Sequence, residues 1–224
     1  ACSGTVRAIG NLKYDVRAPG ENAMAHRLSE MRGASRVIVA GSTLANEEEM
    51  LLSAWPRVLR GAPDIIMVIA PRHPERFQEV YRVIEQSGNL VVLGSQLDKM
   101  NGNLPGGSVV LLDTIGDLAS VYSVASAAFI GGSLVPKGGH NPLEAARFGV
   151  PVIMGESFEN FRDIVEGLKN AWAIRIIKKE QLADALIEAP RYGQKFGERG
   201  REFCSTQLGA TGRAVEALVA LVKR

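Results

Sequence analysis

Short apolar runs that alternate with stretches of helical spacing limit the possible folds of this sequence more than any other feature. The runs are rich in valine and isoleucine and are bounded by Gly, Pro or Asp, which is typical of strands buried on both faces of a parallel sheet. We predict strands at 37–40, 65–70, 90–93, 109–112, 127–130, 152–154 and 173–176. We predict helices at 46–60, 74–86, 118–123, 142–148, 161–168, 179–188, 192–203 and 212–222. This alternation predicts an α/β fold with a doubly wound parallel sheet.

Two of the predicted helices have recognisable start signals. Asn46 and Glu49 have the spacing of a capping box, and Pro74 suits the first turn of the helix that follows it. Residues 1–35 fit the alternation poorly. Within them, residues 11–15 followed by Pro19 and Gly20 predict a strand end that leads into a linker, with a disordered overhang as the alternative.

Composition excludes several classes of function. The 224 residues carry 26 Lys and Arg against 24 Asp and Glu, a net charge of +2. This balance gives no sign of the clustered basic face that nucleic-acid binding needs, but it suits a small anionic ligand in one pocket. The sequence has no Walker A motif and no G-x-G-x-x-G after its first strand, which argues against nucleoside triphosphates and dinucleotides. Its histidines, His26, His73 and His140, lack the spacing of metal ligands, so we expect no metal site.

The most unusual loop follows the predicted strand at 127–130. Residues 131–144 have the sequence Gly-Gly-Ser-Leu-Val-Pro-Lys-Gly-Gly-His-Asn-Pro-Leu-Glu. Ligands bind at the carboxyl ends of strands in open parallel sheets, and four glycines let the backbone approach a ligand closely. Asn141 is expected to cap the next helix, whose free N–H groups would attract phosphate, with Lys137 adding charge and Glu144 accepting from ribose hydroxyls. The alternative is a tight connection in which the glycines serve packing alone.

Two further loops lie at equivalent positions. In residues 70–77, Arg72 offers a fork of donors suited to phosphate or carboxylate, or else is a surface residue between two prolines. In residues 113–118, backbone groups around Gly116 would face a nucleobase edge, although turn chemistry alone also explains this sequence.

These loops resemble the motifs of one family, the 3-deoxy-D-manno-octulosonic acid (Kdo) transferases. The string at 131–144 is highly specific to that family, and residues 71–77 (Pro-Arg-His-Pro-Glu-Arg-Phe) match a second motif almost residue for residue. Residues 113–118 are similar to Asp-Thr-x-Gly-Glu-Leu, with Asp117 where Glu is usual, and residues 11–15 resemble the segment that joins the family's two domains. The resemblance covers essentially the whole chain, but only the C-terminal half of a full-length enzyme.

The resemblance implies a GT-B fold, in which two Rossmann-like domains face each other across a cleft. This chain would be the C-terminal half, which binds the donor CMP-Kdo. The missing half would bind the lipid A precursor and carry the catalytic carboxylate, so no catalytic residue is expected here, nor any metal or other cofactor. Carried over residue by residue, the family's CMP contacts are Pro71, Arg72, Ile115, Gly116, Asp117, Asn141, Pro142, Leu143 and Glu144.

The implied domain organisation has three parts. Residues 1–35 would be the interdomain linker and entry segment, 36–205 the Rossmann-like CMP-sugar-binding domain, and 206–224 a C-terminal helix that crosses to the missing domain. The parent would act in lipopolysaccharide core biosynthesis at the cytoplasmic face of the bacterial inner membrane, whereas the fragment alone would be soluble and inactive. Two alternatives remain open: another GT-B glycosyltransferase that uses a UDP-sugar, and a non-catalytic nucleotide-binding module.

Overall fold

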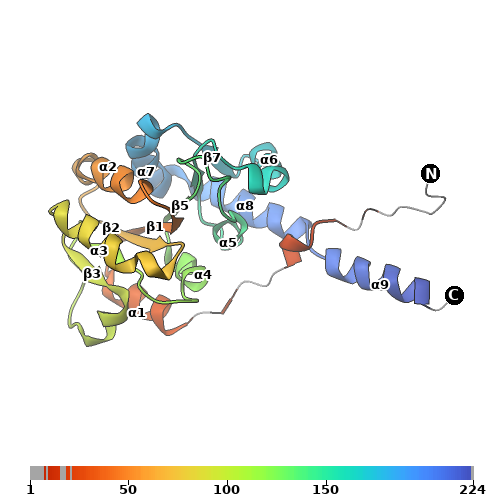
Figure 1. The fold of residues 1–224 in the computed structure, drawn as a ribbon, viewed down its shortest axis with the longest axis horizontal. Coiled ribbons are helices and arrows are strands. Elements are labelled where there is room, and N and C mark those ends of the chain that lie inside the picture. The colour runs from red at the N-terminus through yellow and green to blue at the C-terminus, as the bar shows by residue number, and fades with distance from the viewer. Residues whose placement is uncertain (1–7, 9, 16–18, 21, 223–224) are drawn as a thin grey trace.

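The structure, a computed structural model, describes residues 8, 10–15, 19–20 and 22–222. Residues 1–7, 9, 16–18 and 21 of the predicted linker (1–35), and residues 223–224, lie outside the described residues. The described chain forms one parallel sheet of seven strands in the order β3-β4-β2-β1-β5-β6-β7 (Figure 1). The strands are β1 (Arg36–Thr43), β2 (Ile65–Pro71), β3 (Val91–Leu93), β4 (Val109–Leu111), β5 (Ala127–Ile130), β6 (Val152–Met154) and β7 (Ile174–Ile176). Each predicted strand is present, with ends that differ by at most three residues.

Helices cover both faces of the sheet (Figure 1). The α-helices are α1 (Ala23–Met31), α2 (Glu47–Gly61), α3 (Phe77–Gln86), α4 (Leu118–Val121), α5 (Leu143–Ala146), α6 (Arg162–Asn170), α7 (Leu182–Tyr192), α8 (Gln194–Thr206) and α9 (Ala210–Val222). Short 3₁₀ turns are η1 (Leu12–Asp15), η2 (Pro74–Arg76), η3 (Gly94–Lys99), η4 (Tyr122–Val124), η5 (Glu159–Phe161) and η6 (Lys179–Gln181). Among these described helices, none combines the length and hydropathy needed to cross a membrane.

The strands divide the core into two layers. Along β1, Val37 and Val39 join one apolar cluster, whereas Ile38 and Ala40 join the other. The first cluster is completed by residues of α1, α6 and α8, and the second by residues of α2, α3 and α7. Because successive side chains of a strand point to opposite faces, apolar residues at every position require helices on both sides. The predicted doubly wound α/β fold is therefore confirmed.

The chain order places a topological switch point beside β1. On one side of β1 the sheet continues through β2, β4 and β3, which the chain completes before it crosses to β5, β6 and β7 on the other side. β1 pairs with both β2 and β5, so the connections after β1 and β5 leave in opposite directions. Such a point opens a crevice at the carboxyl ends of the strands.

Three local expectations are corrected. Asn46 makes no side-chain cap and has a left-handed backbone (φ 74°), because Glu47 instead accepts the Leu44 N–H. The helix predicted at 142–148 is α-helical only over α5. Residues 11–15 contain the 3₁₀ turn η1 rather than a strand end.

The entry segment also contains a helix that the sequence analysis left unassigned. Asn22 caps α1 by accepting the Ala25 N–H at 2.9 Å. Ala25, Leu28 and Met31 are buried at a spacing of three, which places one face of α1 against the sheet.

Candidate functional site

A cavity of about 470 Å³ lies at the carboxyl ends of five neighbouring strands. Its walls come from the segments that follow β4, β2, β5 and β6, from the end of β1 at Ser42, and from η1. The lining residues are Lys13, Ser42, Arg72, Gly116, Leu118, Ala119, His140, Asn141, Glu144 and Phe161. The cavity therefore occupies the crevice expected at the switch point.

The three predicted loops meet at this cavity. Arg72, Gly116, Asn141 and Glu144, one or more residues from each loop, line it directly. The other five predicted residues lie next to these but do not line it: Pro71 ends β2, Ile115 is 80% exposed, Asp117 accepts from the Asn22 amide at 2.6 Å, Pro142 precedes α5, and Leu143 is fully buried. Leu143 thus supports the loop from the core and presents no side chain to the cavity.

Arg72 brings a guanidinium group to the cavity, where its charge acts on the Glu144 carboxylate. Its backbone N–H donates to the Thr43 carbonyl at 2.9 Å, which fixes the start of the loop after β2. Its side chain is exposed, and no described residue accepts a hydrogen bond from the guanidinium. A planar fork of donors without a partner suits a phosphate or carboxylate ligand.

Glu144 and Asn141 form the opposite wall. Burial raises the pKa of the Glu144 carboxyl, while the charges of Arg147 and Arg72 and a hydrogen bond from Asn141 act in the other direction. Asn141 Oδ1 accepts the Leu143 N–H at 3.1 Å and so closes a turn just before α5, but the N-cap of α5 is Pro142 and not the predicted Asn141. A half-buried carboxylate beside open space can accept hydrogen bonds from ligand hydroxyls.

The N–H groups at 132–134 do not face a ligand. The carboxylate of Glu47, which has no exposed surface, accepts the N–H groups of Gly132 at 2.7 Å and of Ser133 and Leu134 at 3.0 Å each. Burial raises the pKa of Glu47, although these backbone donors favour its ionised form. The backbone at 132–134 therefore holds an internal carboxylate, and a ligand phosphate has to find donors elsewhere in the cavity.

Sequence reasoning did not select four polar or aromatic residues of the cavity wall: Lys13, Ser42, His140 and Phe161. Ser42 has a left-handed backbone (φ 56°), which no motif revealed. Burial lowers the pKa of His140, helped by the positive charges of Arg72 and His73, and its buried Nε2 has no hydrogen-bond partner among the described residues. Lys13 escaped notice because its segment was assigned to the linker.

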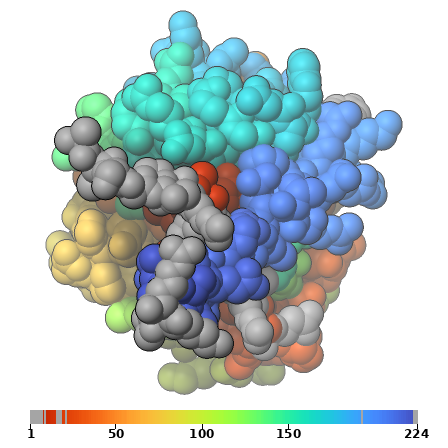
Figure 2. Space-filling view, turned by 90° about the vertical axis from the view of Figure 1, so that its right-hand side faces the viewer, coloured from red at the N-terminus to blue at the C-terminus, as the bar shows by residue number. Residues whose placement is uncertain are grey.

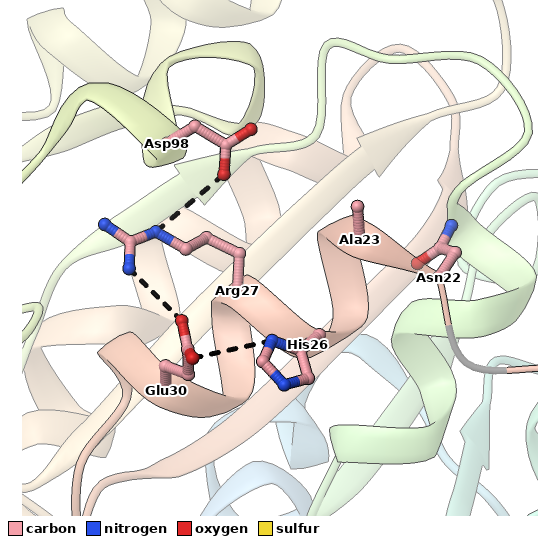
Figure 3. Close-up of a pocket in the computed structure, with 6 residues that line it drawn as sticks. All are labelled: Asn22, Ala23, His26, Arg27, Glu30 and Asp98. Carbon is pink, nitrogen blue, oxygen red and sulfur yellow. Dashed lines mark hydrogen bonds and ion pairs between the residues drawn. The ribbon is translucent and has the colours of Figure 1, made fainter.

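A second hollow, of about 610 Å³, lies along α1 and has a different character (Figure 3). Its charged groups pair with one another: Arg27 contacts Glu30 at 3.2 Å and Asp98 at 3.9 Å, and His26 contacts Glu30 at 3.5 Å. Arg27 also donates to the carbonyls of Leu97 and Met100. These groups fasten α1 to η3, so the hollow offers no unsatisfied donor comparable to Arg72.

The described part of the chain has no group of three or more His, Cys, Asp or Glu side chains arranged to hold a metal ion.

Comparisons with known proteins relate the chain to Kdo transferases over part of their length. No family model matches the chain. The chain is 30% identical to the Kdo transferase of Haemophilus influenzae over 96% of its own length and 51% of that enzyme, and 30% identical to the Bordetella pertussis enzyme over 93% and 50%. It therefore spans about half the length of these curated relatives.

Solved structures agree with the sequence comparison. The C-terminal CMP-Kdo binding domain of WaaA from Acinetobacter baumannii superposes with a TM-score of 0.70 and 26% identity, covering 81% of this chain and 97% of that domain. Anabaena HepE, solved with UDP-glucose, superposes with a TM-score of 0.60 over 89% of this chain and 53% of HepE, and its 13% identity shows a shared fold alone. The chain is thus a homologue of the Kdo transferases over about half their length, with the GT-B-like α/β fold of their C-terminal domain.

Proposed function

We propose that this chain is the donor-binding half of a glycosyltransferase that transfers Kdo from CMP-Kdo to a lipid A precursor in lipopolysaccharide core biosynthesis. The observation that carries the proposal is the cavity at the switch point, where loops after separate strands bring together Arg72, Asn141 and Glu144. Homology to Kdo transferases supports a CMP-sugar as the ligand of that cavity.

The cavity offers complementary groups for each part of CMP. Arg72 has unpaired donors for the phosphate, and the Glu144 carboxylate can accept from ribose hydroxyls. Gly116 lines the cavity with a left-handed backbone (φ 91°) and no atom within 4 Å of a would-be Cβ. A base can therefore approach the peptide groups of this loop without meeting a side chain.

Calorimetric titration with CMP, UMP and AMP tests the proposal, with Glu144→Ala as the variant. We expect saturable binding that is selective for CMP, and a loss of roughly tenfold in affinity in the variant, since it removes a charged hydrogen-bond acceptor. Glu156→Ala is a matched control, because Glu156 is exposed and does not line the cavity. Selectivity for UMP would instead assign a UDP-sugar donor, and equal affinity of the Glu144 variant would contradict the placement of the ribose.

The rest of the reaction is proposed to need the part of the parent that this chain lacks. That part would supply the general base and the lipid A precursor site and would associate with the membrane. We also propose that transfer needs no metal ion, which predicts the same CMP affinity in EDTA and in Mg²⁺. A transfer assay in which this chain alone turned over the acceptor would contradict the proposed division of labour.

A further inference from the structure

The 3₁₀ turn η1, which precedes the sheet in the chain, packs against α8 and the start of α9. Tyr14 is 9% exposed, and its ring meets that of Phe203 on α8 edge to face, with centroids 5.8 Å apart. The Asp15 carboxylate accepts the N–H groups of Gly209, at 2.6 Å, and of Thr211, at the start of α9. Lys13 directly precedes Tyr14 and Asp15 in η1, so the contacts of those two residues fix the position of its backbone.

Lys13 brings an ammonium group to the cavity wall. Its Nζ lies 4.3 Å from the centroid of the Phe161 ring and 3.5 Å from the Asn160 carbonyl oxygen. The side chain is exposed, and no carboxylate among the described residues lies within ion-pair distance of it. An aromatic face and a carbonyl orient the ammonium without neutralising it, which leaves its charge available to an anion.

The strand order separates Lys13 from the predicted base site. Across the sheet, the cavity runs from the segment after β4, past the segment after β2, the end of β1 and the segment after β5, to the segment after β6. Gly116 lies at the β4 end, whereas Lys13 and Phe161 lie at the β6 end, with Arg72, Asn141 and Glu144 between them. A CMP-sugar with its base at Gly116, and its ribose and phosphate in the middle of the cavity among Arg72, Asn141 and Glu144, therefore extends its sugar toward Lys13.

We propose that Lys13 binds the carboxylate of the donor sugar and so selects an acidic sugar over a neutral one. The inference rests on the proposed function and goes beyond it, because a CMP-bound ulosonic acid carries two anionic groups, the phosphodiester and the sugar carboxylate. The cavity wall has two side chains with a permanent positive charge, Arg72 and Lys13, at different positions along it. The matching number of charges, and the place of Lys13 at the end of the cavity away from Gly116, point to one cation for each anion.

Titration of this chain with CMP, CMP-Kdo and a carboxyl-reduced CMP-Kdo analogue tests the assignment. Lys13→Gln keeps a polar side chain of similar reach and removes the charge. It should weaken CMP-Kdo binding roughly tenfold while changing CMP and the reduced analogue less than about twofold. Lys13→Arg should restore most of the affinity for CMP-Kdo. Lys195→Gln is the matched control, since Lys195 is exposed on α8 and does not line the cavity.

The possible outcomes separate the two proposals. If the unmodified chain binds none of the three ligands, the proposed function fails. If it binds CMP but Lys13→Gln weakens all three ligands equally, or weakens none, the carboxylate assignment is wrong and the donor-site proposal stands. The preference for CMP-Kdo over the carboxyl-reduced analogue should also shrink as salt rises in the unmodified chain and not in Lys13→Gln, because an exposed ion pair is screened.

Discussion

Glu47 illustrates how a single residue can take over groups that a motif appears to offer to a ligand. Its buried carboxylate accepts four backbone N–H groups, one from Leu44 and three from residues 132–134. A buried charge is tolerated only when such donors replace water. Gly132, with a left-handed backbone (φ 69°), donates one of these N–H groups, whereas Gly131 allows close packing on β1, since a Cβ on Gly131 would lie 2.3 Å from the Ser42 carbonyl oxygen. One glycine of the pair thus serves an internal anion in the fold, and the other serves packing.

Replacement of Glu47 by glutamine tests this role. The amide has one oxygen, and its NH₂ would face N–H donors, so we expect Glu47→Gln to lower the free energy of unfolding by about 3 kcal/mol. Urea denaturation followed by circular dichroism measures the change. Glu49→Gln, an exposed neighbour on α2, should change it by less than about 0.5 kcal/mol. Equal stability of the two variants would show that the N–H groups at 132–134 do not depend on the carboxylate.

At the scale of elements, the segment from β2 to α3 divides its two arginines between structure and ligand. Arg76 donates to both oxygens of Glu48, at 2.8 and 3.2 Å, and Glu48 is 1% exposed and also accepts from Thr43. This ion pair ties η2 to α2. Arg72, four residues earlier, has no such partner among the described residues and lines the cavity.

Replacement of each arginine by methionine should therefore change a different property, stability for Arg76 and CMP affinity for Arg72. Arg76→Met leaves the Glu48 charge buried and unpaired, so it should lower the free energy of unfolding by about 3 kcal/mol. Arg72→Met should change stability by less than about 0.5 kcal/mol but weaken CMP binding roughly tenfold. Denaturation and calorimetry on both variants check this pair of expectations. Unchanged stability of Arg76→Met would refute the structural role of Arg76. Unchanged CMP affinity of Arg72→Met would refute the ligand-binding role of Arg72.

Strand positions could be predicted from the sequence because burial on both faces leaves continuous Val and Ile runs such as those of β1 and β2. Helix starts were less predictable. Asn46 and Glu49 have capping-box spacing, yet the neighbouring Glu47 is drawn into a contact 85 residues away, with Gly132. Nothing local in the sequence encodes that contact.

The same distinction applies to the candidate site. Arg72, Gly116, Asn141 and Glu144 could be selected because each lies in a loop whose place at the sheet edge follows from the alternation of elements. Lys13 and Phe161 reach the cavity through the packing of η1 against α8 and of η5 after β6. Such tertiary placement leaves no periodic signal in the sequence.

For the molecule as a whole, local stability is expected to fall from the central sheet to the C-terminal helix α9. α9 extends away from the body of the domain (Figure 1), and the view from that side shows its dark-blue surface in front of the body (Figure 2). Its apolar side chains are open to solvent, with Val215 53%, Leu218 63% and Leu221 67% exposed. A helix with so little burial gains almost no stability from packing.

Hydrogen exchange measured by mass spectrometry at low protein concentration tests this gradient. Amide hydrogens of β1, whose central residues are fully buried, should exchange only through global unfolding. Those of α9 should exchange at least about a hundredfold faster than those of α8, where Gly197, Gly200 and Cys204 are buried against the domain. Protection of α9 equal to that of α8 would mean that its apolar residues are covered in solution. A rise of that protection with protein concentration would then identify a second copy of the chain as the cover, whereas concentration-independent protection would show that α9 folds back onto its own domain.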